Sequence, residues 1–406
     1  MNVAVIGSGG REHAIAVKSL TSELVDEVHV IPGNSGMLLT KGLRIHLCWD
    51  GSFPSLETYI KEHTIDLIIV GNEAYLLEGI TDYFVKRNIL IFGPLKNGAK
   101  LEYSKDFAKQ FMKKYNIPTA DYRTFNRYEE ANRYMKSIQG PLVIKQDGLA
   151  LGKGVLVTED RREGELFLKE SFNVTKKIVF EEYLEGKEFS LLTFVNQEYY
   201  NCMAPVRDYK RAFDGDKGLN TGGMGAYTPV EYITEDDLKI IDEYIVRPTI
   251  QGLLDENISF TGILYFGLMK TREGIKVIEY NTRFGDPETE VLLESMESDL
   301  IGAIASTFTK TFFPLRFKSG TTLGVCMASI GYPVNCEKGG KVELNESITP
   351  YSMALRNEGS SFYVDGGRVL FVVQHGDSLE KAREACYKDV KTIKSSALFY
   401  RRDIGL

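Results

Sequence analysis

The first hundred residues contain short runs in which apolar, mostly β-branched residues stand at consecutive positions. These runs are Val3–Ile6, Glu27–Ile31, Asp66–Val70 and Ile89–Phe92, and amphipathic stretches separate them. Consecutive apolar residues are typical of strands that are buried on both faces, and the stretches between them suit crossover helices. This pattern predicts an α/β unit built on a parallel sheet.

The chain has 406 residues, which is longer than a single hydrophobic core usually grows, so several domains are expected. A helix capped by Ser104 is predicted over 104–115, and strands over 142–145 and 178–183 enclose a glycine-rich loop in a small lid-like unit. A larger unit follows, with strands over 191–195, 261–269 and 275–281, a charged loop over 207–225 and a helix over 235–254. The last unit has strands over 323–329 and 368–374 and a helix over 378–394. The predicted domains are 1–103, 104–188, 189–319 and 320–406.

Charge and cysteine usage limit the partners and the compartment. Lys and Arg number 49 against 56 Asp and Glu, for a net charge of -7, so neither nucleic acid nor an anionic membrane is expected as a partner. The five cysteines form no Cys-x-x-Cys pair, which is typical of a reduced protein. No apolar run has the length of a membrane span or a signal peptide. We therefore expect a cytoplasmic protein.

A glycine-rich turn follows the first predicted strand and opens a helix. It contains Gly9, Gly10 and Arg11, at a position where backbone N–H groups and the helix dipole favour an anion. Glu12 stands where a dinucleotide-binding fingerprint has its third glycine, and the second strand does not end on an acidic residue, so nicotinamide cofactors are disfavoured. Arg11 suits a terminal phosphate. The alternative is a tight turn without a ligand.

A second glycine cluster spans residues 147–154. It is not a Walker A loop, because its spacing is short and Gly154 replaces the Ser or Thr that would hold magnesium. Its backbone amides and the preceding Lys145 could bind the phosphates of a nucleotide. The alternative is a flexible hairpin.

Glu279 and Asn281 lie two residues apart on a predicted strand, so both point to one face and Tyr280 points away. A carboxylate and an amide oxygen are ligands that Mg²⁺ prefers, with phosphates and water completing its shell. Arg283, Asp286 and Glu288 add charge nearby, so a structural ion-pair cluster stays the alternative. The histidines have no zinc-site spacing and the chain has no Gly-x-Ser-x-Gly elbow.

Taken together and in order, segments along essentially the whole chain resemble the phosphoribosylamine–glycine ligase (glycinamide ribonucleotide synthetase) family of the ATP-grasp superfamily. The matching segments are GSGGREHA at 7–14, PGNSG at 32–36, IKQDGLALGKGV at 144–155, FEEYLEGKEFS at 180–190, NTGGMGAYTP at 220–229, RFGDPETE at 283–290 and RRDIG at 401–405.

The resemblance implies a multidomain α/β and α+β protein: a Rossmann-like N-terminal domain, two ATP-grasp subdomains that enclose ATP, and a small mixed C-terminal domain. It also implies that ATP, with Mg²⁺ or Mn²⁺, activates glycine as glycyl phosphate. The amine of 5-phosphoribosylamine then displaces phosphate and gives glycinamide ribonucleotide. Such phosphoryl transfer depends on positioning and charge neutralisation rather than on a protein nucleophile. A monomer is expected.

The resemblance also implies roles for individual residues. The residues expected to bind ATP are Lys105 and Lys145 on the phosphates, Gly152, Lys153 and Gly154 in the closing loop, Glu181, Glu182, Tyr183 and Leu184 at the adenine, and Glu188 at the ribose. The expected metal ligands are Glu279 and Asn281. The residues expected to bind phosphoribosylamine are Gly9, Gly10, Arg11 and Glu73, and those expected at the glycine and acyl-phosphate end are Lys210, Arg283 and Asp286.

The chain departs from the family pattern at Asn72, Tyr209 and Leu219, where the family has Pro, His and Pro, and the family's His-Ala-Gly-Thr segment has no clear counterpart over 353–361. Two rival functions stay open at this point. One is a related ATP-grasp enzyme that uses formate or another carboxylate. The other is a nucleotide-binding regulatory protein without turnover.

Overall fold

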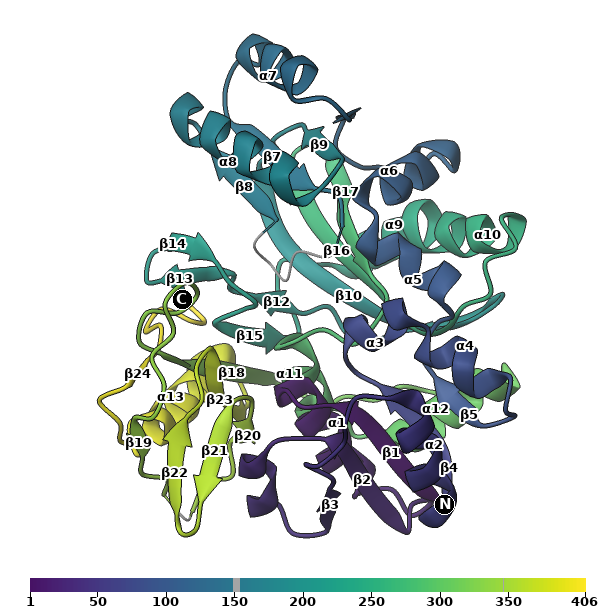
Figure 1. The fold of residues 1–406 in the computed structure, drawn as a ribbon, viewed down its shortest axis with the longest axis vertical. Coiled ribbons are helices and arrows are strands. Elements are labelled where there is room, and N and C mark those ends of the chain that lie inside the picture. The colour runs from purple at the N-terminus through teal and green to yellow at the C-terminus, as the bar shows by residue number, and fades with distance from the viewer. Residues whose placement is uncertain (149–153, 346) are drawn as a thin grey trace.

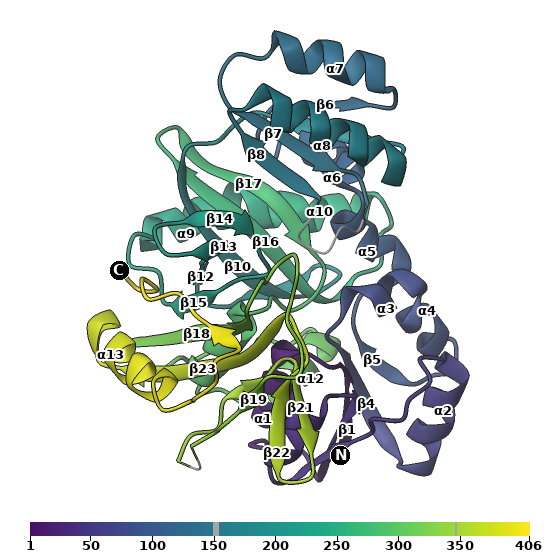
Figure 2. The same cartoon turned by 60° about the vertical axis from the view of Figure 1, so that its left-hand side comes forward.

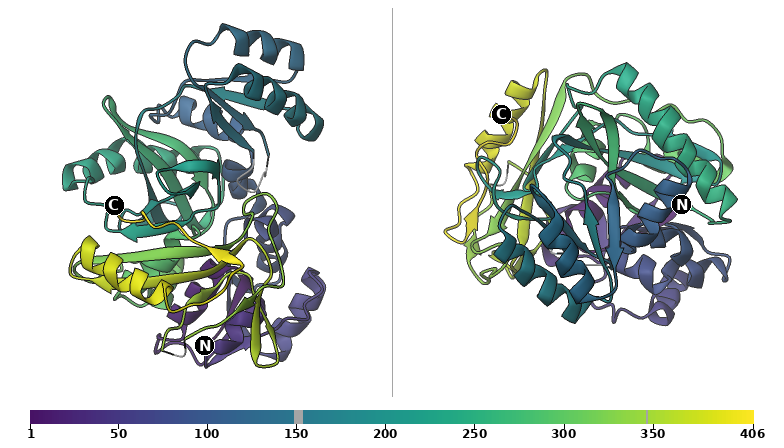
Figure 3. Two further views of the ribbon diagram at one scale, coloured as in Figure 1. Left: turned by 90° about the vertical axis from the view of Figure 1, so that its left-hand side faces the viewer. Right: turned by 90° about the horizontal axis from the view of Figure 1, so that it is seen from above.

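A computed structural model describes residues 1–148, 154–345 and 347–406. The N-terminal sheet and the C-terminal sheets lie side by side at one end of the molecule, and the central antiparallel sheet lies above them (Figure 1). The lid, which is the small unit predicted within 104–188 and includes α7 (Tyr128–Ser137) and α8 (Arg161–Val174), projects from the far end (Figure 3). The multidomain α/β and α+β fold predicted from the sequence is confirmed. Within the described residues, no helix combines the length and apolar character needed to cross a bilayer.

The N-terminal sheet is parallel throughout, as the consecutive apolar runs predicted. Its strands, in spatial order, are β3 (Leu43–Ile45), β2 (Glu27–Pro32), β1 (Asn2–Gly7), β4 (Ile65–Val70) and β5 (Leu90–Phe92). The helices and the 3-10 turn of this region are α1 (Gly10–Ser19), η1 (Ser35–Leu39), α2 (Phe53–Glu62), α3 (Glu73–Glu78), α4 (Ile80–Val85) and α5 (Lys96–Tyr103). Helix α1 packs on one face of the sheet, and α2 to α4 pack on the other. The prediction missed β3, because three partly exposed residues give no apolar run.

The lid is an antiparallel sheet with two helices on one face. Its strands, in spatial order, are β6 (Tyr122–Phe125), β9 (Ile178–Glu181), β7 (Leu142–Gln146) and β8 (Val155–Thr158). The helices are α6 (Lys105–Lys114), which leads into the lid, α7 (Tyr128–Ser137) and α8 (Arg161–Val174). Leu142 and Ile144 of β7 pack with α7 and α8, so Val143 and Lys145 lie on the opposite face of the strand.

The central sheet is also antiparallel, in the order β11 (Tyr199–Cys202), β10 (Gly186–Asn196), β16 (Thr261–Thr271) and β17 (Gly274–Asn281). The helix predicted over 235–254 consists of α9 (Glu235–Ile241), a π-helical turn η2 (Asp242–Val246) and α10 (Arg247–Asp255). A β-bulge interrupts β17, where the pairing passes from Glu279 opposite Gly267 to Val277 opposite Leu268. The bulge leaves Ile278 as the extra residue of β17.

The C-terminal sheet draws strands from both sides of the predicted 319/320 boundary. Its order is β12 (Arg207–Asp208), β15 (Gly225–Thr228), β18 (Thr321–Ser329), β23 (Arg368–Gly376) and β20 (Tyr351–Ser352), and β24 (Leu398–Phe399) also pairs with β18. A smaller sheet contains β19 (Lys341–Val342), β22 (Ser361–Val364) and β21 (Leu355–Glu358). The remaining helices are α11 (Glu288–Ser295), α12 (Leu300–Thr309) and α13 (Leu379–Val390).

The prediction of a loop over 207–225 was wrong. Besides β12, this segment contains a hairpin of β13 (Arg211–Phe213) and β14 (Lys217–Asn220), in which Arg211 lies opposite Asn220 and Phe213 opposite Lys217. The hairpin turns at Gly215 and Asp216, both of which have positive φ. Its strands have three and four residues and are mostly exposed, so they are too short for an alternation of apolar residues to mark them in the sequence.

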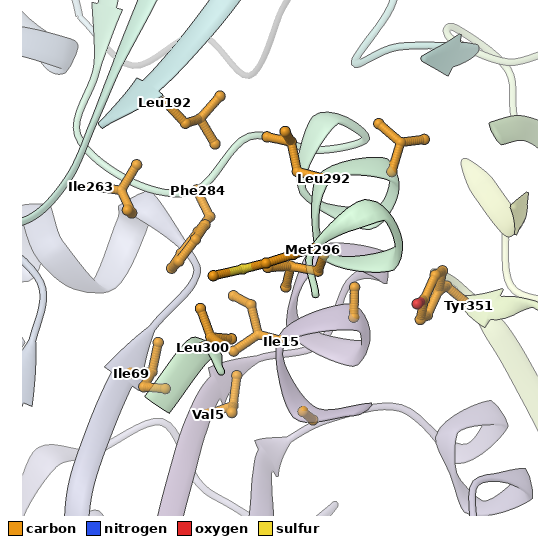
Figure 4. Close-up of a cluster of buried hydrophobic side chains, with 14 of the residues drawn as sticks. Val5, Ile15, Ile69, Leu192, Ile263, Phe284, Leu292, Met296, Leu300 and Tyr351 are labelled. Atoms are coloured by element: carbon orange, nitrogen blue, oxygen red, sulfur yellow. The ribbon is translucent and has the colours of Figure 1, made fainter. Parts of the chain in front are cut away.

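One hydrophobic core joins the parts at the base of the molecule (Figure 4). It contains Val5 and Ile69 from the N-terminal sheet, Leu192 and Ile263 from the central sheet, and Tyr351 from the C-terminal sheet. Helix α11 contributes Leu292, and helix α12 contributes Leu300. Because these side chains pack on one another, the base is a single body, and the lid has its own small core.

Candidate active site

A cleft of about 550 Å³ lies between the lid, the central sheet, the N-terminal domain and the C-terminal domain. Most residues predicted for the site line it. They are Arg11, Glu73, Lys105, Lys145, Gly154, Glu181, Glu182, Tyr183, Leu184, Glu188, Lys210, Glu279, Asn281, Arg283 and Asp286.

Gly9 and Gly10 do not line this cleft. Helix α1 begins at Gly10, as predicted, with Gly9 as its N-cap. Glu12 folds back on this start, and the N–H of Gly9 donates to Glu12 Oε2 over 2.7 Å. A side chain at Gly7 or Gly71 would collide with the Glu12 carboxylate, so these glycines make room for it. The anion that the helix start favours is therefore a carboxylate of the chain itself. The predicted Gly152 and Lys153 lie outside the described residues.

A buried ion triplet lines the cleft on the side of the lid sheet. Lys145 Nζ of β7 lies 2.9 Å from Glu181 Oε1 of β9, and Lys109 Nζ of α6 lies 2.9 Å from Glu181 Oε2. Burial lowers the pKa of Lys109 to about 8, although Glu181 opposes the change. The pKa of Glu181 is lowered, because the two lysines outweigh the cost of burying its charge. The prediction missed Lys109, although it stands four residues after Lys105 and so on the same face of α6.

The start of α6 is tied to the glycine-rich loop. Ser104 caps the helix by accepting from the N–H of Phe107, and its hydroxyl donates to Asp147 over 3.2 Å. Lys105 Nζ donates to the carbonyl of Gly148 over 3.3 Å. Lys105 and Lys145 therefore reach the same part of the cleft from α6 and β7, as predicted for two lysines that bind one phosphate chain.

Glu279 and Asn281 face the cleft from β17, as the strand period predicted. Tyr280 points away into the core and shares a hydrogen bond of 2.9 Å with Thr249. Burial works against the charge of Glu279, but the surrounding cations, Lys145 foremost, hold its pKa below the ordinary range. Glu279 is thus a carboxylate at neutral pH.

The donor set at Glu279 and Asn281 fits a divalent cation bound together with phosphates. Both side chains offer oxygen, the donor atom that Mg²⁺ and Mn²⁺ prefer. No group of three or more His, Cys, Asp or Glu suited to a metal occurs in the part of the chain that the structure describes. A cation here would need further ligands from a phosphorylated substrate and water.

Apolar side chains of the lid and the central sheet form a wall of the same cleft that suits a planar base. Val143, Val155 and Val157 line the cleft from the lid, and Met269 lines it from the central sheet. The predicted hinge residues 181–184 line the same cleft. The N–H of Glu182 donates a hydrogen bond to the carbonyl of Asp121 over 2.8 Å.

Arg283 joins carboxylates of the N-terminal region at the other end of the cleft. Its Nε lies 3.3 Å from Glu73 Oε2, and its Nη2 lies 3.1 Å from Glu102 Oε1. Arg11 Nη2 lies 3.7 Å from the same oxygen of Glu73. Burial disfavours the charge of Glu73, but Arg283 and Arg11 outweigh it and lower its pKa to about 2. Two guanidinium groups and one carboxylate thus meet at one point.

Arg368 reaches the cleft from β23, which the sequence did not reveal. Its Nη2 lies 2.8 Å from Asp286 Oδ1, and its Nη1 donates to the carbonyls of Gly222 and Asp286 over 2.9 and 3.0 Å. Arg368 therefore fixes two cleft loops that belong to different parts of the sequence.

Lys210 lies between two carboxylates. Its Nζ is 2.7 Å from Asp208 Oδ2 and 3.4 Å from Glu188 Oε1. Burial alone would lower the pKa of Lys210, but Asp208 outweighs it and the pKa rises well above the ordinary value. Burial raises the pKa of Glu188, and Lys210 opposes part of that rise. Among the lining residues that the prediction did not name are Glu102, Lys109, Tyr265 and Arg368.

Sequence models of one family match the chain in order. They are the N domain of phosphoribosylglycinamide synthetase over residues 1–102, its ATP-grasp (A) domain over 103–289 and its C domain over 322–406. The phosphoribosylamine–glycine ligase of Listeria innocua is 45% identical over 417 aligned residues, which cover 100% of this chain and 99% of the relative. That of Lactococcus lactis is 44% identical over 409 residues, with the same coverage.

Solved structures give the same result. The crystal structure of the phosphoribosylamine–glycine ligase of Thermotoga maritima is similar with a TM-score of 0.87 at 35% identity and covers 100% of both chains. The biotin carboxylase domain of the Hydrogenobacter thermophilus 2-oxoglutarate carboxylase, solved with MgADP, has a TM-score of 0.72 at 15% identity and covers 98% of this chain and 91% of that one. At that identity the second likeness concerns the fold alone.

Proposed function

The chain belongs to the phosphoribosylglycinamide synthetase family, and from this membership we infer that the cleft is where it joins glycine to 5-phosphoribosylamine as ATP is converted to ADP and phosphate. The reaction is that of a phosphoribosylamine–glycine ligase and passes through glycyl phosphate. The two rival functions lose their support, because the relatives that match the whole chain at 44–45% identity are ligases of this one kind.

ATP binds between the lid and the central sheet in this proposal. Lys105, Lys145 and Lys109 supply the positive charge for its phosphates. Glu181 forms ion pairs with both Lys145 and Lys109 and so fixes their positions. The apolar wall of the cleft takes the adenine, with the backbone of the hinge 181–184 at the adenine edge and Glu188 at the ribose. Such binding positions the γ-phosphate and neutralises its charge, which is what phosphoryl transfer requires.

Glu279 and Asn281 would hold Mg²⁺ or Mn²⁺. The cation, once bound with the nucleotide, would neutralise charge on the phosphates. The support is chemical: the two side chains offer oxygen, face one cleft and lie beside the lysines predicted for the phosphates.

Arg283, Lys210 and Asp286 act at the end of the cleft where glycine and phosphoribosylamine meet. The glycine carboxylate attacks the γ-phosphorus and displaces ADP, which gives glycyl phosphate. The amine of phosphoribosylamine then attacks the carbonyl of glycyl phosphate, expels phosphate and loses a proton. Arg283 and Lys210 stabilise the anionic groups in both steps. Glu73, fixed by Arg283 and Arg11, is placed to accept hydrogen bonds from ribose hydroxyls, and Arg11 adds charge for the substrate phosphate.

One observation carries this assignment: Lys105, Lys145, Glu279 and Asn281, which are scattered through the sequence, line the same cleft. The test is a ligation assay with ATP, MgCl₂ and freshly generated phosphoribosylamine, in which glycine and formate are compared and ADP and product are both measured. We expect ADP and glycinamide ribonucleotide in equal amounts with glycine only. Turnover with formate, or ATP binding without ADP formation, would refute the assignment. Monomeric state, cytoplasmic location and the absence of nucleic-acid or membrane partners stay predictions from the sequence.

A further inference from the structure

The motif Arg401–Gly405, near the end of the chain, has no part in the chemistry described so far. None of its residues lines the cleft, and it packs against the β13–β14 hairpin, near which the C-terminus is marked in Figures 1 and 2. The hairpin directly follows Lys210, so the motif touches a segment that carries a cleft residue.

Arg401 is almost fully buried, at 1% exposure, and its guanidinium group makes a set of short polar contacts. Its Nη1 donates to the carbonyl of Arg211 over 3.0 Å and to Asp216 Oδ1 over 2.9 Å. Its Nε and Nη2 each lie 2.8 Å from one oxygen of Asp403, a forked pair. Such a fork fixes orientation as well as position. Arg401 therefore ties strand β13 and the turn of the hairpin to the tail.

Tyr209 connects this contact to the cleft. The residue lies between Asp208 and Lys210, its ring is buried, and the guanidinium carbon of Arg401 sits 5.1 Å from the ring centre. Its hydroxyl accepts from the N–H of Gly405 over 3.0 Å. Along the chain its two neighbours point to the cleft, where Lys210 Nζ and Asp208 Oδ2 are 2.7 Å apart. A shift of Tyr209 would thus move both cleft residues.

The tail is itself anchored on the side away from the cleft. The hydroxyl of Tyr387 on α13 donates to the carbonyl of Arg401 over 2.7 Å, and Arg383 Nε donates to the carbonyl of Ile404 over 3.1 Å. Ile404 is fully buried and packs in the core of the C-terminal sheet. Because α13 and the core of the C-terminal sheet fix the tail, the tail can hold the hairpin in place.

We propose that the C-terminal tail is a positioning element of the active site, in which Arg401 and Gly405 hold Tyr209 and so set where Asp208 and Lys210 stand in the cleft. The inference rests on the proposed function to the extent that Lys210 acts on the substrates. None of the tail residues touches substrate in this account, since none lines the cleft.

A double-mutant cycle tests this proposal. The variants are Arg401→Met, Lys210→Met and the two combined, assayed for kcat and for KM of each substrate, with folding checked by circular dichroism. We expect Arg401→Met to lower kcat about 10-fold to 100-fold, because small misplacements of positioned groups have effects of that size. Affinity for a non-hydrolysable ATP analogue should not change. The double variant should be no slower than Lys210→Met, since coupled residues are not additive.

Two further variants separate positioning from folding. Arg401→Lys keeps the charge without the fork and should recover part of kcat, and Tyr209→Phe removes only the hydroxyl that Gly405 contacts and should give a smaller loss of the same non-additive kind. Arg402→Ala is the matched control, because that neighbouring side chain is exposed and forms no hydrogen bond or ion pair with the described residues. It should leave kcat unchanged.

The possible results distinguish a failure of this inference from a failure of the proposed function. Wild-type kcat in Arg401→Met, or losses that multiply in the double variant, would overturn the inference and leave the proposed function intact. Wild-type kcat in Lys210→Met would instead remove Lys210 from the proposed mechanism, and the inference would fall with it. The single variant that fails to respond shows which of the two claims is wrong.

Discussion

His13 links the N-terminal helix α1 to the C-terminal sheet and should make stability depend on pH. Its ring is 1% exposed, and its Nδ1 accepts from the N–H of Ser352 over 2.8 Å. The other ring nitrogen lies 2.8 Å from the hydroxyl of Thr40. Because Nδ1 accepts, the ring must be neutral. Protonation would place an N–H against the N–H of Ser352 in a buried site.

The magnitude follows from the two pKa values of His13. Burial lowers its pKa from 6.5 to about 4 in the folded protein. A difference of roughly two and a half pKa values, at about 1.4 kcal/mol each, corresponds to about 3 kcal/mol. The unfolded chain binds the proton first as the pH falls, so this stability is complete above pH 6.5 and is lost progressively between pH 6.5 and about 4.

The assay is urea unfolding of wild type and His13→Asn at pH values from 7 to about 4. Asparagine offers an acceptor at the place of Nδ1 and does not titrate, so the variant keeps the contact to Ser352 but loses the pH dependence that His13 causes. Within this window we expect the wild-type free energy of unfolding to fall by about 3 kcal/mol more than that of the variant. Parallel curves would refute the argument, because the carboxylates that also titrate there are common to both proteins.

Other substitutions test the site and the fold. Glu279→Ala should lower kcat by at least about a hundredfold through loss of a metal ligand, whereas Cys202→Ala, remote from the cleft, should leave it unchanged; normal turnover in the first variant would contradict the metal assignment. Glu181→Gln should lower the free energy of unfolding by about 3 to 5 kcal/mol, because it leaves two buried ammonium groups without their carboxylate; a loss below 1 kcal/mol in urea titration would count against the triplet. Gly223→Ala should cost about 1 to 3 kcal/mol, since Gly223 has φ +119° and a Cβ there would overlap Pro287; an unchanged Tm in calorimetry would contradict this.

Features set by neighbours in the sequence could be predicted. The strand period placed Glu279 and Asn281 on one face, and the cap at Ser104 placed the start of α6. The parallel sheet followed from runs such as Val3–Ile6, because residues buried on both faces leave a continuous apolar signal. These predictions depended on spacings of a few residues only.

Features that depend on contacts between residues far apart in the sequence could not be predicted. Arg368 stands 82 residues after Asp286, and nothing near either residue indicates that they meet. The turn at Gly9 and Gly10 was correctly predicted as a helix start. The sequence did not reveal that Glu12 would fill it, because part of the room for its carboxylate comes from Gly71, which directly follows β4. Lys109 could have been found from its spacing to Lys105, and its role depends on Glu181 in the lid.

The sheet in which β15 pairs with β18 has a practical consequence for anyone who cuts this chain into pieces. A gene split after residue 319 would place β15 in one polypeptide and β18 in the other, and each would expose a strand edge that the intact protein covers. Expressed alone, the two polypeptides should aggregate. Expressed together, they should reassemble through that edge, which would make this junction a natural place for a split-enzyme reporter.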